Sequence, residues 1–224
     1  MNDNMIGARA LMVALEKEGV KEVFGLPGGA NLPMYDELYK SNIRHILVRH
    51  EQDAAHMADG FGRVSRKPGV CFATSGPGAT NLLTGIATAQ ADSAPMVAVT
   101  GQVPVAMIGK DAFQESDIIG MANPAVKYSY QPRTPEEIPE VVKQGFYIAE
   151  TGRPGPVLLD IPKDVQQNEG KFTFPDEVRI PGYHPWTDVD ITNIERAIDL
   201  LLSSEKPIIL AGGGTIISSA FAEL

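Results

Sequence analysis

The sequence predicts an α/β fold: a doubly wound, mainly parallel sheet with helices on both faces. Two observations support this prediction. Short apolar runs of strand length alternate with helical patterns as far as residue 161. Beyond residue 189, a further helix and a short apolar run follow a proline-rich stretch, which indicates the start of a second α/β domain. We therefore expect a first domain over residues 1–165, a linker over 166–189, and the start of a second domain over 190–224.

The composition is typical of a globular protein. Of the 224 residues, 43% are hydrophobic and 21% are charged. The net charge of −9 argues against a nucleic-acid-binding or membrane-binding surface. Cys71 is the single cysteine, so no internal disulfide can form, and a reducing compartment is favoured. Because no signal-peptide pattern or membrane-spanning run is present, we expect a cytoplasmic protein that binds neither nucleic acid nor membranes.

Each predicted strand of the first domain is an apolar run bounded by turn residues. These runs are 20–26, 43–48, 70–74, 95–100, 126–130 and 156–161. The 43–48 run is expected to be a buried strand. Between the strands, the predicted helices cover 5–18, 33–39, 51–62, 80–91, 111–119 and 134–151. The last of these has the strongest start signal, because Thr134 can cap it and Pro135 suits its first turn.

The segment over residues 166–189 is polar and interrupted by prolines, which favours a linker. After it, an amphipathic helix is predicted over 190–204, a strand over 207–210, and a helix opening at the glycines that follow. Roughly 35 residues cannot bury a core of their own. We therefore expect this chain to be part of a longer protein.

Glu51 lies where the predicted strand 43–48 gives way to a helix. The carboxyl edge of a parallel sheet is where such folds bind ligands. A structural alternative is that Glu51 only complements the positive end of the helix. The turn from Ser75 to Gly78 also has two interpretations. Its glycines let the backbone approach a ligand, but a plain tight turn without a ligand would have the same sequence pattern.

Four segments with site-like residues directly follow predicted strands. They are Pro27-Gly28-Gly29, Glu51, Ser75-Gly76-Pro77-Gly78 and Gly101-Gln102. The carboxyl ends of parallel strands meet at one edge, whereas purely structural glycines would be scattered over both edges. The sequence therefore predicts a binding site at this edge.

Six motifs in chain order indicate a family. They are Phe24-Gly25-Leu26-Pro27-Gly28-Gly29, Arg49-His50-Glu51-Gln52, Thr74-Ser75-Gly76-Pro77-Gly78-Ala79-Thr80-Asn81, Thr100-Gly101-Gln102-Val103-Pro104, Asp111-Ala112-Phe113-Gln114-Glu115 and Gly152-Arg153-Pro154-Gly155-Pro156-Val157. With them, the chain resembles the N-terminal, pyrimidine-binding domain of thiamine diphosphate enzymes. It is most similar to the catalytic (large) subunit of acetolactate synthases, also called acetohydroxyacid synthases.

The resemblance implies that Glu51 is catalytic. In the family this glutamate hydrogen-bonds N1′ of the cofactor's aminopyrimidine and favours the imino tautomer, which takes the proton from thiazolium C2. The resulting ylide attacks pyruvate. The resemblance also implies a set of further residues at the thiamine diphosphate. These are Pro27, Gly28, Thr74, Pro77 and Asn81 around the pyrimidine, and Gln114 near the reacting end.

Other roles implied by the resemblance concern the substrate and a second cofactor. Phe113 matches a residue beside the bound donor, and Lys163 matches a lysine at the substrate entrance. Arg153, Gly213 and Gly214 match positions that hold FAD. Structural alternatives are a surface ion pair for Arg153 and core packing for Phe113. Two positions depart from the family pattern, Leu26 in place of an aromatic residue and Asp53 in place of glycine.

The family binds Mg²⁺ through a Gly-Asp-Gly block with a downstream asparagine in a C-terminal domain, and no such block occurs in this chain. We therefore expect no metal ligand within these 224 residues. The resemblance implies a homodimer or tetramer with active sites between subunits, and it allows for a regulatory small subunit.

The activity implied is decarboxylation of pyruvate and transfer of the hydroxyethyl unit to a second 2-oxo acid, the first common step of branched-chain amino acid synthesis. The chain alone is expected to be inactive. Alternatives are another thiamine diphosphate enzyme, of the pyruvate oxidase type or a sulfoacetaldehyde acetyltransferase, or a non-catalytic part that dimerises or binds FAD. A plain dinucleotide dehydrogenase is not favoured, because no Gly-x-Gly-x-x-Gly follows the first strand.

Overall fold

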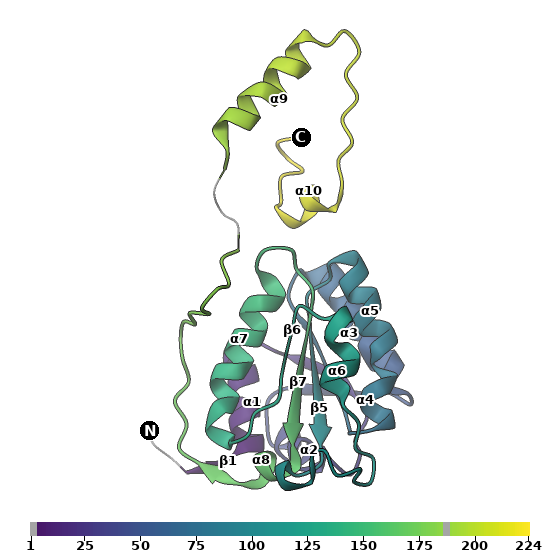
Figure 1. Ribbon diagram of the computed structural model, residues 1–224, viewed down its shortest axis with the longest axis vertical. Helices are drawn as coiled ribbons and strands as arrows, with labels where there is room; N and C mark the ends of the chain where they lie inside the picture. The colour runs from purple at the N-terminus through teal and green to yellow at the C-terminus, as the bar shows by residue number, and fades with distance from the viewer. Residues whose placement is uncertain (1–3, 186–188) are drawn as a thin grey trace. The chain divides into compact units, whose positions relative to one another are not determined.

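The computed structural model describes residues 4–185 and 189–224, which form two compact units, Met1–Tyr183 and His184–Leu224. The first unit is built on a six-stranded sheet with the order β3-β2-β4-β5-β7-β6. Every neighbouring pair in this sheet is parallel. Helices cover both faces (Figure 1), so the predicted doubly wound α/β fold is confirmed.

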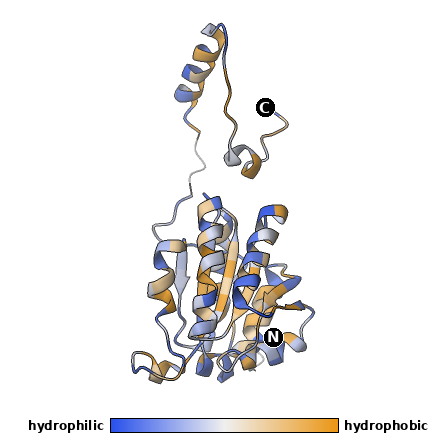
Figure 2. Ribbon diagram, turned by 90° about the vertical axis from the view of Figure 1, so that its right-hand side faces the viewer, coloured by the Kyte–Doolittle hydropathy of each residue, from blue (hydrophilic) through white to orange (hydrophobic). Residues whose placement is uncertain are grey.

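The strands of this sheet agree with the predicted apolar runs to within a few residues. They are β2 Glu22–Gly25, β3 Arg44–Leu47, β4 Gly69–Ala73, β5 Met96–Gln102, β6 Tyr128–Tyr130 and β7 Pro156–Pro162. The strands β4, β5 and β7 are buried along their whole length, and Figure 2 shows hydrophobic residues concentrated in the middle of the sheet. The prediction of a buried strand over 43–48 is wrong, because β3 is an edge strand and Leu47 is 63% exposed.

Two hydrophobic clusters form the core, one on each face of the sheet. The helices of the first face are α1 Gly7–Lys17, α2 Leu32–Tyr39, α7 Ile138–Glu150 and α8 Lys163–Gln167. Those of the second face are α3 Glu51–Ser65, α4 Pro77–Asn81, α5 Leu83–Asp92 and α6 Ile118–Ala122. Short 3₁₀ turns lie at Val105–Met107, Asn123–Ala125 and Pro135–Glu137. The close packing of α5 on α3 depends on Gly85, since a Cβ there would lie 2.4 Å from Cβ of Ala55.

The predicted helix over 111–119 is wrong. This region is a loop, and α6 begins only at Ile118. Asp111 and Gln114 adopt left-handed backbone conformations, with φ of 52° and 56°, which no α-helix contains. The carboxylate of Glu115 accepts hydrogen bonds from the backbone N–H groups of Gly109 and Ala112, which closes the loop on itself.

The first unit extends beyond residue 165, into the segment expected to be a linker. Gln166 is fully buried and donates to the carbonyls of Ala30 (2.8 Å) and Ile161 (2.7 Å). A short strand, β8 Glu169–Gly170, pairs antiparallel with β1 Met5–Ile6, so residues 5 and 6 are not helical as predicted. The first unit also takes up apolar side chains further along, Phe172, Phe174, Ile180 and Tyr183.

The second unit contains α9 Ile191–Ser203 and α10 Gly213–Ile217. The strand predicted over 207–210 is not formed, because no described segment of this unit pairs with it. No described residue after Tyr183 is buried, which agrees with the expectation that so short a segment cannot form a core. Across the described ranges, no helix is both long and apolar enough to cross a membrane.

Candidate active site

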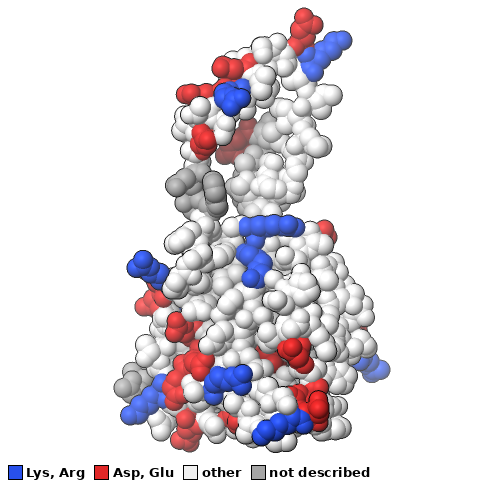
Figure 3. All heavy atoms as spheres, in the orientation of Figure 1, with Lys and Arg blue, Asp and Glu red and all other residues white. Residues whose placement is uncertain are grey.

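The six parallel strands end at one edge of the sheet, the lower edge in Figure 1. Glu51, the turn over 75–78, Gln102 and Lys163 all lie at this edge, because each ends a strand or closely follows one. The structure therefore brings together the segments that the sequence predicts to share a site. Figure 3 shows acidic and basic side chains intermixed on the face it displays, with no extended basic patch there.

Glu51 is the first residue of α3 and is only 9% exposed. Its Oε2 accepts a hydrogen bond of 2.9 Å from Nδ2 of Asn81, the last residue of α4. Its Oε1 has no hydrogen-bond partner within the part of the chain that the structure describes. One oxygen is thus held in place, and the other is free for a ligand.

Gly78 packs tightly against Thr74 beside this carboxylate. A Cβ at Gly78 would lie 3.2 Å from Oε1 of Glu51 and 2.7 Å from Cγ2 of Thr74. Any side chain would therefore have to displace Thr74. Gly76 has a φ of +59° and would, with a Cβ, collide with the carbonyl oxygen of Gln114 at 2.6 Å. Both glycines of the predicted turn are required by local geometry.

Thr74 joins this turn to the loop after β2. Its Oγ1 accepts from the N–H of Ala30 at 3.0 Å. The loop is also closed by buried Asn31, whose Oδ1 accepts from the N–H of Gly28 at 2.7 Å. A Cβ at Gly28 would lie 2.6 Å from Cβ of Thr74. Pro27 and Pro77 are both exposed at the outside of these turns.

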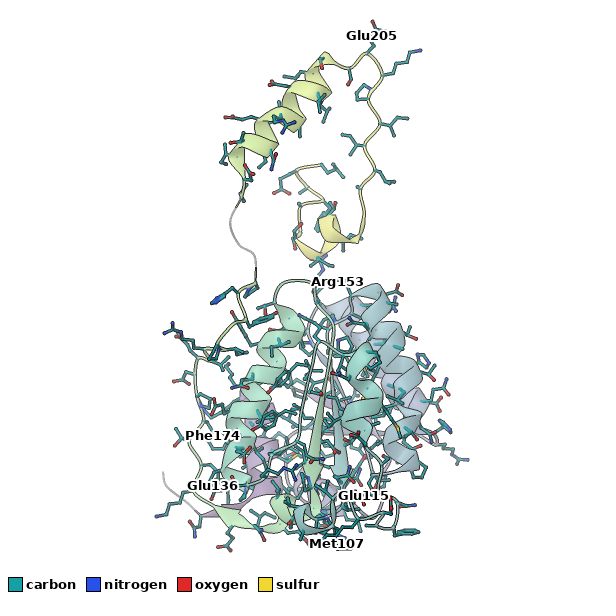
Figure 4. All side chains as sticks on the ribbon, viewed as in Figure 1. Met107, Glu115, Glu136, Arg153, Phe174 and Glu205 are labelled. Carbon is teal, nitrogen blue, oxygen red and sulfur yellow. The ribbon has the colours of Figure 1, made fainter. Side chains whose placement is uncertain are left out.

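Phe113 and Gln114 are exposed on the loop between the 3₁₀ turn Val105–Met107 and α6. Phe113 is 87% exposed, so the alternative that it packs in the core does not hold. Lys163 is half-buried at the start of α8, directly after β7. Figure 4 labels Met107 and Glu115, which flank this loop region at the same end of the first unit. These positions agree with the predicted substrate side of the site, and their roles remain predictions.

Sequence reasoning missed a buried polar cluster at this edge. Asp160 of β7 is fully buried and accepts three hydrogen bonds. Thr100 Oγ1 donates to Oδ1 at 2.6 Å, and the side-chain amides of Gln102 and Gln131 donate to Oδ2 at 3.0 and 2.7 Å. Burial raises the pKa of Asp160 to about 6, although the three donors act in the opposite direction. A carboxylate inside a wholly apolar strand was the available signal in the sequence.

A cavity of about 520 Å³ opens beside this cluster. Its lining includes Gln102, Ser116, Tyr130, Gln131 and Arg133. The same loop therefore lines the cavity, through Ser116 among others, and packs against the turn at Gly76, through Gln114.

Tyr35 is a second buried group near Glu51. Its ring packs edge-on against His45 and Phe72, and its hydroxyl has no hydrogen-bond partner among the described residues. Burial, with smaller contributions from Cys71 and Glu51, raises the pKa of Tyr35. Burial likewise raises the pKa of Cys71, which is a core residue and is therefore unreactive.

Arg153 does not belong to this edge. It precedes β7 and lies at the opposite end of the first unit (Figure 4). Its guanidinium donates to Oγ of Ser93 at 2.7 Å and to the carbonyls of Gln90 and Ala91 at 3.3 and 3.1 Å. Arg153 thus caps the C-terminal end of α5, and no ion pair of Arg153 is found in the described part of the chain. Gly213 and Gly214 open α10 in the second unit.

The structure shows the surroundings of Asp53 and Leu26, the two residues that depart from the family pattern. Asp53 is exposed in the first turn of α3, where solvent screens its charge. Leu26 is partly buried against the core of the second face. Among the residues described, no group of three or more His, Cys, Asp or Glu side chains could hold a metal ion.

Comparison with known proteins identifies the family. The model of the thiamine pyrophosphate enzyme N-terminal TPP binding domain matches residues 5–121, more than half of the chain. Thiamine pyrophosphate and thiamine diphosphate are the same compound.

Several curated relatives match almost the whole chain. It is 58% identical to the probable acetolactate synthase large subunit of Methanocaldococcus jannaschii, over 98% of this chain and 38% of that protein. It is 50% identical to the acetolactate synthase large subunit of Corynebacterium glutamicum, over 99% and 36%, and 51% identical to the acetolactate synthase of Arthrospira platensis, over 97% and 39%. The chain thus spans less than two fifths of the length of these relatives. It belongs to the family of thiamine pyrophosphate enzymes, whose N-terminal TPP binding domain it contains.

Proposed function

We propose that this chain is the N-terminal part of an acetolactate synthase large subunit and supplies the proton-handling half of its thiamine diphosphate site. The observation that carries the proposal is the carboxylate of Glu51, which is buried, held through Oε2 by Asn81 and free at Oε1. The names of the relatives support the choice of acetolactate synthase among thiamine diphosphate enzymes.

The residues around Glu51 fit an aminopyrimidine ring. A flat aromatic ring needs access to the hydrogen-bonding oxygen, and Gly78 has no side chain to cover it, since a Cβ there would lie 3.2 Å from Oε1 of Glu51. Thr74 and Gly28 form a rigid wall, since their close contact allows little movement. We propose that these residues, with Pro27, Pro77, Asn81 and Gln114, border the cofactor.

Thiamine diphosphate, when bound, supplies the nucleophilic carbon and the electron sink of the reaction. Glu51 then holds and exchanges a proton with N1′ of the aminopyrimidine through Oε1. The hydrogen bond from Asn81 keeps the carboxylate oriented, so that the exchanging oxygen faces the ring. A carboxylate can change its proton occupancy by one at this position, whereas an amide cannot.

The proposed substrates are pyruvate and a second 2-oxo acid, both of which are anions. Lys163, at the end of β7, offers a positive charge for a substrate carboxylate. Phe113 is available to pack beside the donor, because its side chain is exposed at the same edge of the sheet.

The cofactor's diphosphate needs a divalent cation with oxygen ligands. We propose that Mg²⁺ is held by a part of the protein outside these 224 residues, and that FAD is bound with the help of Arg153, Gly213 and Gly214. We further propose a cytoplasmic homodimer or tetramer with active sites between subunits, together with a regulatory small subunit. The proposed role of Glu51 supports active sites between subunits, because the groups that bind the diphosphate would then come from another part of the protein or from another subunit.

The product of the full-length enzyme tests the proposal. Purified enzyme with thiamine diphosphate, Mg²⁺, FAD and pyruvate should form acetolactate, detected as acetoin after acid decarboxylation. Acetyl phosphate formed in phosphate buffer would instead indicate the pyruvate oxidase type, and acetyl phosphate formed from sulfoacetaldehyde would indicate the acetyltransferase. Cofactor binding without turnover of any of these substrates would contradict the assignment.

A further inference from the structure

Asp160 takes no part in the proton exchange proposed for Glu51, yet it is fully buried and accepts three hydrogen bonds. A buried carboxylate is destabilising unless its oxygens are well hydrogen-bonded. Both oxygens of Asp160 have donors, and Gln102 and Gln131 both donate to Oδ2. The residues that donate to Asp160 are therefore the ones whose positions it can fix.

Gln102, the last residue of β5, links Asp160 to the site edge. Its side chain is only 2% exposed, and all its hydrogen-bonding groups are used. Nε2 donates to Oδ2 of Asp160 at 3.0 Å and to the carbonyl of Ser116 at 2.9 Å, while Oε1 accepts from the N–H of Val103 at 2.9 Å. The negative charge of Asp160 decides that the amide nitrogen faces Ser116, because the flipped amide would place oxygen against carboxylate.

The carbonyl of Ser116 lies at the end of the 109–117 loop, which carries Phe113 and Gln114. Within the described part of the chain, the bond from Gln102 is the only hydrogen bond between residues 111–117 and the sheet. Glu115 accepts hydrogen bonds from the N–H groups of Gly109 and Ala112, which lie within the loop itself. At its other side, the carbonyl of Gln114 is packed against Gly76. The loop is thus held between one amide and one glycine.

We propose that Asp160 is a positioning residue that acts through Gln102 to fix the 109–117 loop, and hence Phe113 and Gln114, against the turn next to Glu51. The loop has no helix or strand of its own to keep its shape. Once Gln102 can rotate, Ser116 is released from the sheet and the loop gains alternative positions. The kinetic consequence rests on the proposed function, whereas the effect on loop mobility does not.

Two variants of the full-length enzyme test this positioning role. Asp160→Leu removes both acceptor oxygens and keeps a side chain of similar size, and Gln102→Met keeps the length of the side chain but removes the bond to Ser116. Hydrogen–deuterium exchange followed by mass spectrometry should show exchange over residues 109–117 that is at least about fivefold faster in both variants. The ratio kcat/KM for pyruvate should fall about 10- to 100-fold, the effect of misplacing groups that contact the substrate.

Val157→Ala is the matched control. Val157 lies on the same strand, is fully buried, and faces the opposite side of the sheet from Asp160. The control should lower the melting temperature and leave both kcat/KM and exchange over 109–117 unchanged.

The proposal is overturned if the Asp160→Leu and Gln102→Met enzymes keep kcat/KM within about twofold, or lose it with loop exchange at the control rate. If Asp160→Leu does not fold, Gln102→Met decides, since it leaves the bonds from Thr100 and Gln131 to Asp160 in place. If the unmutated enzyme forms no acetolactate, the proposed function fails, and loop exchange alone then decides whether Asp160 anchors the loop.

Discussion

At the scale of single residues, the proposed chemistry depends on Glu51 and Gly78. The carboxylate is held by Asn81 through Oε2, and a Cβ at residue 78 would lie 3.2 Å from its other oxygen. This arrangement differs from a carboxylate that merely complements a helix N-terminus, since such a group needs neither burial nor a second partner. A substitution at Gly78 should therefore affect the cofactor more than the fold.

We expect Gly78→Ala to weaken cofactor binding about 10- to 100-fold in the full-length enzyme, because the new Cβ forces Thr74 to shift. The thiamine diphosphate concentration that gives half-maximal activity measures this effect. Gly60→Ala, in α3, is the control, because a Cβ at that position meets no atom within 4 Å. Equal cofactor concentrations for both variants would show that Gly78 is not part of the cofactor pocket.

The raised pKa of Asp160 predicts that the free energy of unfolding depends on pH. Its folded-state pKa is raised from 3.8 to about 6, so the folded protein binds this proton more tightly than the unfolded chain. The contribution of Asp160 is most favourable below about pH 4 and is lost as the pH rises through 6. The shift corresponds to about 3 kcal/mol.

Urea unfolding between pH 4 and pH 7 measures this contribution as the difference between the unmutated chain and Asp160→Asn. Relative to the variant, the unmutated chain should lose stability as the pH rises over that range. A difference that stays constant with pH would contradict the raised pKa of Asp160.

At the scale of elements, the 109–117 loop and the start of α8 form the proposed substrate side of the site. Both Phe113 and Lys163 lie at the carboxyl edge, and neither is buried. We expect Phe113→Ala and Lys163→Ala to change KM for pyruvate or kcat by about tenfold or more while the melting temperature barely moves. Val64→Ala, at an exposed apolar position of α3, should change neither quantity. A large loss of stability with normal kinetics would instead indicate that Phe113 has a structural role.

The strands and their shared edge could be predicted from the sequence, because apolar runs and glycine turns are local signals. The loop at 109–117 could not, since its shape depends on left-handed residues at Asp111 and Gln114 and on a carboxylate that bonds back within the loop. The exposure of β3 was also out of reach, because an apolar run does not reveal whether its strand lies at the edge of a sheet.

The buried cluster around Asp160 shows the same limit within the site. Thr100 and Gln102 lie about 60 residues away in the sequence, and their contact with Asp160 follows from strand order, where β5 neighbours β7. The strand order is a property of the folded sheet. Glu51, by contrast, was predictable because strand end and helix start adjoin in the sequence.

At the scale of the whole molecule, the chain contains Glu51, the residue proposed for proton exchange, and its described residues contain no cluster for a divalent cation. We therefore expect the 224-residue chain alone to bind Mg²⁺ and thiamine diphosphate only weakly. Titration calorimetry with both ligands measures this. A dissociation constant near the micromolar range, about −8 kcal/mol, would show that this chain anchors the diphosphate by itself.

Proton exchange at C2 of the bound thiamine diphosphate tests the role of Glu51 most directly. In the full-length enzyme, NMR follows the loss of the C2 proton to deuterium after rapid mixing and acid quench. Glu51→Gln keeps the size of the side chain and removes the exchangeable carboxyl proton, so we expect the cofactor to bind and exchange to slow by about 100-fold or more. Exchange as fast as in the unmutated enzyme, with the cofactor fully bound, would contradict the assignment of Glu51 as the catalytic residue.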